Sequence, residues 1–336
     1  MALVAYRLAF RGPIHLGTGR EGDLADLDFP PRSDTIASAI VALWRHVGGG
    51  ASDQEVTRIA AQPPFAVSSA MPTVLVGDKW ETLLFLPAGI FDRLLPLSGA
   101  ERKILKRVRF GSIESLQSLL NGRMPHGAIA RGDALVPATF DGELWTNHSR
   151  LRLQVDRMGD RPMDGQLYEF GGVHLANNVC LIVVVDFIDA GCRSTVEAAL
   201  ALLGDEGIGA DRTAGYGAFT VEHVEERFAP DLGTGARLSL SLLHPTRDEI
   251  AGGLLDSPAE YLITTRGGWA TSMNTVSFRR KVVNMLAEGS LVKDLGSRRY
   301  GDSAMVLEPG DSGPSHPVCR LGTAVTLPIK PPDAPQ

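Results

Sequence analysis

The sequence predicts an α+β protein made of two ferredoxin-like units, each a β-sheet backed by helices. Three observations predict it. The 336 residues exceed the usual size of one domain, and 44% of them are hydrophobic, which is enough for more than one buried core. Short alternating strands and amphipathic helices also follow one another along the chain. We expect one unit over residues 1–228, a second over residues 229–330 and a disordered, proline-rich tail over residues 331–336.

The first unit is expected to begin with a strand, a loop and a helix. Residues 2–10 alternate loosely and stop at Gly12-Pro13, which is typical of a strand that ends in a turn. Ser33-Asp34-Thr35 precede apolar residues at helical spacing, and either of the first two can cap the free N–H groups of a helix start. Strands are predicted over residues 65–70 and 82–86.

A long β-hairpin is predicted as an insertion over about residues 147–173. One strand alternates basic or polar residues with apolar ones, and its partner begins near residue 166 after a stretch of turn-forming residues. Arg150, Arg152 and Arg157 lie on this hairpin and could follow an RNA backbone, while the apolar face packs or wedges between splayed bases. A solvated strand face is the alternative, and Arg157 could form a surface ion pair with Asp156.

A glycine-rich loop is predicted over residues 204–217. Glycines permit positive φ and close backbone approach, so such a loop can direct several N–H groups at a phosphate while Arg212 supplies charge. An ordinary surface connection is the alternative, and the spacing alone favours it. Beyond the loop, further strands are expected in the second half, over residues 237–243, 261–265, 276–285 and 324–329.

Composition limits the classes of function. The net charge of −6 argues against broad, nonspecific nucleic-acid binding, so any RNA site must be a local basic groove on an acidic body that is free to face other proteins. The three cysteines lack CxxC spacing, so neither a metal site nor a disulfide framework is expected, and no cofactor is. The apolar stretch before Arg7 is too short for a signal peptide or a membrane span, which favours a cytoplasmic protein.

Several polar residues have both a structural and a functional interpretation. His15 could hydrogen-bond a phosphate or a ribose hydroxyl, or it could pack or cap. Ser33 and Thr35 could bind a phosphate at the helix start, cap the helix, or do both. The basic run over residues 102–109 is interpreted first as a solvated helix face. Two further pairs could contact RNA or an acidic neighbouring subunit: Arg279 with Arg280, and Arg298 with Arg299.

Four segments together resemble the RAMP superfamily, in particular the subunit of the type III-A CRISPR (Csm) effector complex that caps the 5′ end of the guide RNA. The first is FRGPIHLGTG from residue 10, followed by Ser33-Asp34-Thr35. The second runs from residue 147 to 168 with VDR and GQLY, and the third is the loop GIGADRTAGYG from residue 207. The fourth pairs AEGS from residue 287 with HPVCRLG from residue 316. The resemblance spans nearly the whole chain.

The resemblance implies a non-catalytic protein with RAMP domains, a hairpin thumb, and binding to the repeat-derived 5′ handle of the crRNA. It also implies docking to the large palm-polymerase-like subunit and to the adjacent RAMP backbone subunit, without metal, cofactor or membrane. The predicted RNA-binding residues are His15, Gly17, Arg20, Ser33, Thr35, Asn147, Arg150, Arg152, Arg157, Gly209, Arg212, Thr213, Gly215, Tyr216, Gly217, Arg279, Arg280 and Arg320.

Three rival functions stay open on the sequence. One is the equivalent capping subunit of a type III-B complex, and another is a scaffold that meets other subunits without reading RNA. The third is a metal-independent RAMP endoribonuclease that processes repeat RNA with His15 as general base. No second histidine or lysine can be assigned next to His15 from spacing.

Overall fold

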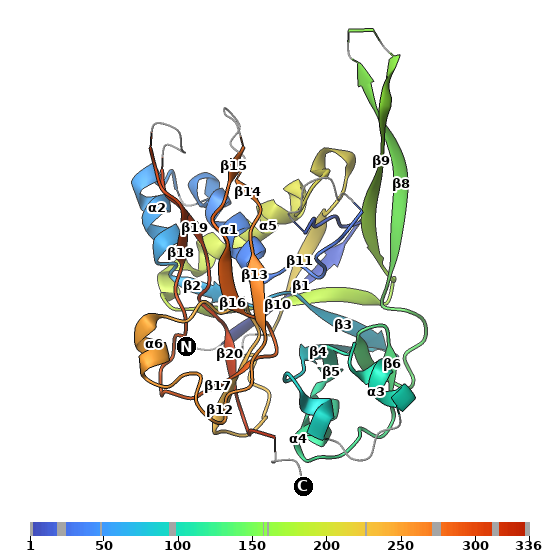
Figure 1. Ribbon diagram of the computed structural model, residues 1–336, viewed down its shortest axis with the longest axis vertical. Coiled ribbons are helices and arrows are strands. Elements are labelled where there is room, and N and C mark those ends of the chain that lie inside the picture. The colour runs from blue at the N-terminus through green and yellow to red at the C-terminus, as the bar shows by residue number, and fades with distance from the viewer. Residues whose placement is uncertain are drawn as a thin grey trace.

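The computed structural model describes residues 3–18, 25–47, 49–93, 99–156, 158–159, 161–225, 227–270, 277–310 and 316–332. A large sheet forms the centre of the body, helices cover it, and one long hairpin projects away from it (Figure 1). The mixed α+β architecture is as predicted. None of the described helices is both long enough and apolar enough to cross a membrane.

The central sheet has nine strands, and two of them, β2 and β3, pair with the same edge of β10. The order along the rest of the sheet is β11 (Phe219–Glu225), β1 (Leu3–Phe10), β10 (Val179–Phe187), β3 (Met71–Val76), β4 (Lys79–Phe85), β5 (Phe110–Ser112), β7 (Ala134–Pro137) and β6 (Ala128–Arg131). Strand β2 (Phe65–Val67) pairs with the end of β10, and β3 pairs with its start, both antiparallel. No local pattern predicted β3, which follows β2 after only three residues.

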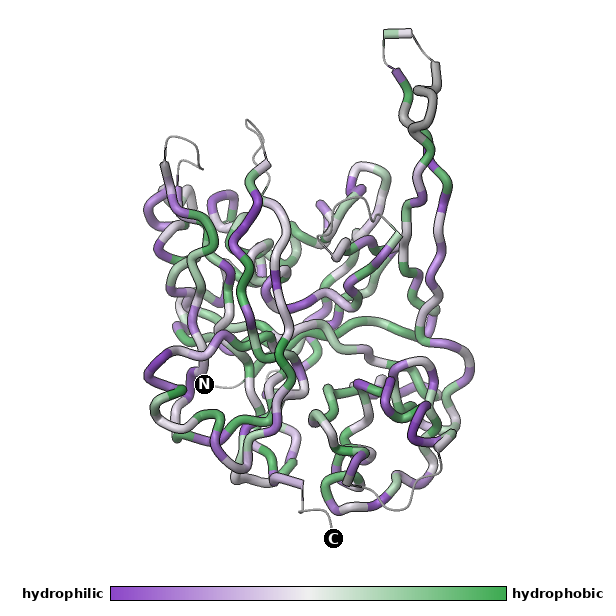
Figure 2. The backbone as a smooth tube through the Cα atoms, viewed as in Figure 1, coloured by the Kyte–Doolittle hydropathy of each residue, from purple (hydrophilic) through white to green (hydrophobic). Residues whose placement is uncertain are grey.

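Strand β10 explains why its sequence is apolar at nearly every position. Leu181, Val183 and Val185 pack with α1 (Ser33–Val47) and α5 (Arg193–Glu206) on one side of the sheet. The alternate residues Ile182 and Val184 pack on the other side, with strands from the second half of the chain. A strand that is covered on both faces has no solvent side, so its sequence does not alternate. Figure 2 shows this strand as hydrophobic along its length.

Two local signals set the ends of helices in the first half. Helix α2 (Asp53–Ala61) is capped by Ser52, whose Oγ accepts a hydrogen bond from the amide of Glu55 at 3.2 Å. Between β4 and β8 the chain adds the 3₁₀ turn η1 (Ile90–Arg93), α3 (Gly99–Leu105) and α4 (Ile113–Leu120). Ser112 caps α4 in the same way.

The predicted hairpin is present and is longer than expected. It consists of β8 (Trp145–Asp156) and β9 (Arg161–Leu175), which pair only with each other as named strands. In the register, Arg152 faces Tyr168 and Leu153 faces Leu167. Arg152 and Tyr168 therefore lie on one face of the hairpin, and three exposed leucines, Leu151, Leu153 and Leu167, lie on the other face together with Glu169.

The second half of the chain differs from the expectation of a sheet backed by its own helices. Its described residues contain one helix, the five-residue α6 (Arg247–Ala251), which is held by a capping box of Thr246 and Glu249. Three strands form a sheet in the order β17-β12-β20: β12 (Ala236–Ser239), β17 (Leu291–Lys293) and β20 (Thr326–Ile329). The other strands form three pairs: β13 (Ile263–Arg266) with β16 (Val283–Leu286), β14 (Trp269–Ala270) with β15 (Phe278–Arg279), and β18 (Ala304–Leu307) with β19 (Val318–Arg320).

A shared core explains why this half needs few helices. Leu238, Leu327 and Ile329 belong to the same buried cluster as Leu83 and Phe110 of the first half. The first half therefore covers the three-stranded sheet where helices of its own were expected. Burial of that common surface makes the two halves one hydrophobic body.

Candidate nucleic-acid interface

Three segments that the sequence analysis singled out meet at the base of the hairpin. Ile14 and Val173 exchange two backbone hydrogen bonds of 2.9 Å, which fixes the opening loop on β9. On its other side, the amide of Gly217 donates to Pro13 at 2.8 Å and that of Ala210 donates to His15 at 3.0 Å. The opening loop is therefore clamped between the hairpin and the glycine-rich loop.

Close packing accounts for two of the glycines. A Cβ on Gly209 would lie 2.1 Å from the carbonyl oxygen of His15, and one on Gly217 would lie 2.0 Å from that of Ile208. Both residues have positive φ, 95° and 73°. No other residue type fits either condition, so the structure of the loop itself requires these glycines.

Most amides of the glycine-rich loop are used inside the protein. Those of 207, 208, 210 and 214–217 donate to backbone carbonyls. Among the described residues, the amides of 209 and 211–213 have no acceptor, and the last three open the 3₁₀ turn η3 (Arg212–Ala214). The expectation that several N–H groups face a phosphate is therefore restricted to Gly209 and this turn.

Arg152 joins the hairpin to the loop. Its Nη2 donates to Oδ2 of Asp211 at 2.5 Å, and its guanidinium lies 4.3 Å from the ring centroid of Phe170 and 5.7 Å from that of Tyr216. Asp211 has φ of 63° and is the only non-glycine residue with positive φ in the described chain. The arginine predicted to follow RNA thus has an internal ion pair and cation–π contacts.

His15 and Tyr216 are core residues of this junction. Each is 2% exposed. The Nδ1–H of His15 donates to the carbonyl of Gly171 at 2.8 Å, and its ring stacks on Phe170 with centroids 4.1 Å apart. The hydroxyl of Tyr216 lies 3.4 Å from Nε2 of His148. Neither side chain is open to RNA in this arrangement, and the packing interpretation describes His15.

A pair of histidines lies beside this junction. The rings of His148 and His174 are 4.5 Å apart, and Nδ1 of His148 is buried without a hydrogen-bond partner. Burial lowers the pKa of His148, and the nearby charges of His174 and Arg150 lower it further. The folded protein therefore favours neutral His148.

The remaining predicted residues of this region are on the surface or outside the described chain. Arg150 is exposed and forms no ion pair with a described carboxylate, whereas Arg212 lies 3.4 Å from Glu206. Arg20 and Arg157 lie outside the described residues. The other exposed predicted residues are Gly17, Asn147, Gly209, Thr213, Gly215 and Arg279, and Gly217 is buried.

The start of α1 is occupied by protein groups. Ser33 is 4% exposed; its amide donates to Oγ of Ser69 at 2.8 Å, and its own Oγ accepts from the amide of Leu242 at 2.9 Å. Thr35 is half-buried. The predicted phosphate role of Ser33 is therefore corrected, because its hydroxyl connects the helix start to the second half of the chain.

Arg320 is likewise a structural residue and not a surface contact. It is 4% exposed, its Nη1 donates to Oδ2 of Asp34, and its Nη2 donates to the carbonyl of Gly267 at 2.6 Å. Arg266 forms a bidentate pair with the same carboxylate, both distances being 3.0 Å. Burial alone would raise the pKa of Asp34, but the two guanidinium groups outweigh it and hold that pKa below its usual value.

This buried pair belongs to a larger charge network between the two halves. Arg266 also donates to Asp28, which accepts from Nε of Arg32 at 2.8 Å. Arg32 continues to Glu288 at 3.0 Å. The members of this network lie up to 286 positions apart, so no local pattern in the sequence predicts which arginine reaches which carboxylate.

Residues 234–329 match the family model of the CRISPR Csm4 C-terminal domain. Over these residues the chain is similar to the Csm4 proteins. A curated relative described as CRISPR system Cms protein Csm4, from Methanocaldococcus jannaschii, is 25% identical over 212 residues, which are 56% of this chain and 55% of the relative. This chain thus matches about half the length of that relative.

Solved Csm4 structures have the same fold. A chain of the Csm3-Csm4 subcomplex of a type III-A interference complex matches with a TM-score of 0.63 and 19% identity, over 98% of this chain and all of that one. A chain of the Csm1-Csm4 cassette in complex with cA4 matches with a TM-score of 0.59 and 18% identity, over 99% and 100%. Within the described part of this chain, no three His, Cys, Asp or Glu side chains are grouped to hold a metal ion.

Proposed function

We propose that this protein is a non-catalytic crRNA-binding subunit of a type III-A CRISPR interference complex. It binds the repeat-derived 5′ handle and docks the large palm-polymerase-like subunit and the adjacent RAMP backbone subunit. The observation that carries the proposal is the match of residues 234–329 to the Csm4 C-terminal domain. The similar solved chains come from assemblies with Csm3 and with Csm1, which supports the two protein partners.

We infer that RNA follows the base of the hairpin and the exposed turn of the glycine-rich loop. Arg150 supplies a cation that forms no ion pair with a described carboxylate. Arg212, Thr213 and Gly215 are exposed on the turn where the amides of 212 and 213 have no acceptor among the described residues. Cations and free amides are the groups that bind phosphates. Arg279 belongs to the same proposal, as do Arg20 and Arg157.

The hairpin acts as a thumb across the guide RNA in this proposal. Leu151 is 69% exposed and Leu167 is 63% exposed on one face, at the far side of the strands from Arg150. Apolar side chains that stay in water without a protein partner suit insertion between unstacked bases.

The fold assignment is part of the same proposal. Four strands in the order β11-β1-β10-β2/β3, with α1 after β1 and α5 after β10, fit a ferredoxin-like RAMP unit over residues 1–228. The hairpin and the segment from β4 to β7 are insertions in it. Residues 229–330 are then a second RAMP unit with reduced helices.

We infer no catalytic role. The endonuclease alternative needs His15 as a general base within reach of a ribose hydroxyl. A ring that is 2% exposed, stacked on Phe170 and hydrogen-bonded to a backbone carbonyl lacks that access.

The test compares guide RNA with an intact or a scrambled 5′ handle for binding to the purified protein at two salt concentrations, followed by denaturing gels. We expect handle-dependent binding without cleavage. Arg150→Ala with Arg212→Ala, both at exposed positions, should weaken it by about 1–3 kcal/mol and reduce the salt slope. The matched control, Arg102→Ala with Lys103→Ala, removes the same charge from exposed positions on α3 and should change handle preference little. Cleavage would support the nuclease, and binding unchanged by Arg150→Ala with Arg212→Ala would support a scaffold.

A further inference from the structure

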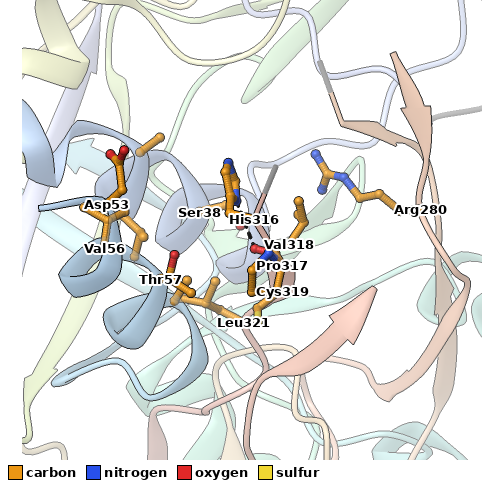
Figure 3. Close-up of a pocket in the computed structure, with 13 residues that line it drawn as sticks. Ser38, Asp53, Val56, Thr57, Arg280, His316, Pro317, Val318, Cys319 and Leu321 are labelled. Carbon is orange, nitrogen blue, oxygen red and sulfur yellow. Dashed lines mark hydrogen bonds between the residues drawn. The ribbon is translucent and has the colours of Figure 1, made fainter. Parts of the chain in front are cut away.

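A cavity of about 230 Å³ opens between α1, α2 and β19 (Figure 3). Its walls are mainly aliphatic and include Val41, Val56, Ala60, Val318 and Leu321. The first three come from the two helices, and the others come from the C-terminal end of the chain. The junction of the two halves thus leaves an apolar opening that their shared core does not fill.

Arg280 supplies a charge to this cavity. Figure 3 shows its guanidinium extending from the residue after β15 toward Val318 and His316. Its Nε is buried without a hydrogen-bond partner, and no ion pair joins it to a described carboxylate. A buried guanidinium N–H without an acceptor costs free energy that an anionic ligand would recover.

The neighbouring charge network cannot neutralise Arg280. The network contains four arginines, Arg32, Arg266, Arg280 and Arg320, and three carboxylates, Asp28, Asp34 and Glu288. The other three arginines all form ion pairs with those carboxylates. Burial lowers the pKa of Arg280, and the positive charges of Arg320 and Arg266 lower it further while Asp34 opposes them. The surplus positive charge of the network therefore faces the cavity.

The surroundings of the cavity select the class of ligand. Asp53, at the start of α2, also lines the cavity, but its carboxylate pairs with Arg45 at 2.6 Å and lies at the opposite side of the cavity from Arg280 (Figure 3). Among the described residues that line the cavity there is no Phe, Tyr or Trp on which a base could stack. The volume is below the range of about 300–1,000 Å³ that is usual for small-molecule sites, and it suits a single anchoring side chain.

We propose that this cavity docks a segment of a protein partner that presents one branched apolar side chain directly beside a carboxylate. The apolar group fills the space between α1 and α2, and the carboxylate pairs with Arg280. The choice of a protein occupant rests on the proposed role in an assembly, whereas the chemistry of the cavity is independent of RNA binding.

The first test uses N-acetyl-leucine, in which a branched side chain and a carboxylate are adjacent, and its neutral amide as the isosteric control. Calorimetry on the full chain should give about tenfold tighter binding of the acid. Arg280→Gln should abolish that preference, and Arg279→Gln, at the exposed neighbouring position, should retain it. Equal binding of acid and amide, or no binding of either, would overturn the proposal.

The second test identifies the source of the ligand. The chain is co-expressed with the two partner subunits of the proposed complex, and Arg280→Gln or Ala60→Trp, which fills the cavity, should reduce co-purification of one of them several-fold. Handle RNA binding by Ala60→Trp, whose site is outside the predicted RNA-binding residues, should stay at the level of the unmodified protein. If both variants assemble normally although the acid preference depends on Arg280, the cavity takes a free acid and the docking proposal is wrong. If the unmodified protein does not bind handle RNA, the proposed function is refuted, whereas the proposal for this cavity is unaffected.

Discussion

Replacement of Asp34 by Asn tests whether the buried charge network holds the two halves together. The substitution keeps the shape of the side chain and removes its charge, so Arg266 and Arg320 keep their positive charges with side chains only 16% and 4% exposed. The new amide N–H₂ would also point donors at guanidinium donors. Breaking a buried pair from one side costs about 3–5 kcal/mol.

The loss is measurable by thermal and urea unfolding. With about 2.1 cal/mol/K of unfolding entropy per residue, a chain of 336 residues should lose about 4–7 °C in Tm. The matched control is Asp53→Asn, which breaks the exposed pair of Asp53 and Arg45 and should cost about 0–1 kcal/mol. If Asp34→Asn melted within about 1 °C of the unmodified protein, the network would contribute nothing and the reasoning would be refuted.

The pH dependence supplies a second check on Asp34. Its pKa in the folded protein is lowered, so its contribution is fully present above its unfolded pKa of about 3.9 and is lost as the pH falls toward the folded value. The stability difference between Asp34→Asn and the unmodified protein should therefore be constant from about pH 5 to 8. A difference that vanished at neutral pH would contradict the assignment.

Three further predictions concern the junction and the hairpin. Gly217→Ala should lower the free energy of unfolding in urea by about 2–3 kcal/mol, because its Cβ would meet a carbonyl oxygen at 2.0 Å. The control Gly142→Ala also has positive φ, 95°, but its Cβ would have no atom within 4 Å, so it should cost about 1 kcal/mol. Equal losses for the two variants would contradict the packing argument. Since the pKa of His148 is lowered in the folded state, unfolded chains bind more protons, and stability should fall as the pH drops through about 6.5. His148→Gln should flatten this dependence of stability on pH. An unchanged dependence would exclude His148 as its source. Leu151→Ser at a 69% exposed position should leave unfolding within about 0.5 kcal/mol yet weaken retention of handle RNA, and unchanged retention would argue against a wedging face.

Local pattern was enough to predict the elements that carry the candidate site. The hydrophobic run of β10, the capped start of α1 and the period-two alternation of β8 are each recorded in consecutive residues, because neighbouring side chains report which face is solvated. The glycine-rich loop was also identified from sequence, although two of its glycines are explained by contacts with carbonyl oxygens of His15 and Ile208.

Tertiary structure alone decided which polar residues are free to act. Arg152 and Arg320 were predicted to contact RNA, yet in the structure they pair with Asp211 and Asp34, which are 59 and 286 positions away. Arg280 has the same residue type and a similar local context, and it has no carboxylate partner among the described residues. A charge is satisfied by whatever the fold brings within about 4 Å, and that distance depends on long-range packing which the sequence pattern does not encode. The sequence determined the elements and the candidate residues, and only the packed chain separated structural arginines from those available to a ligand.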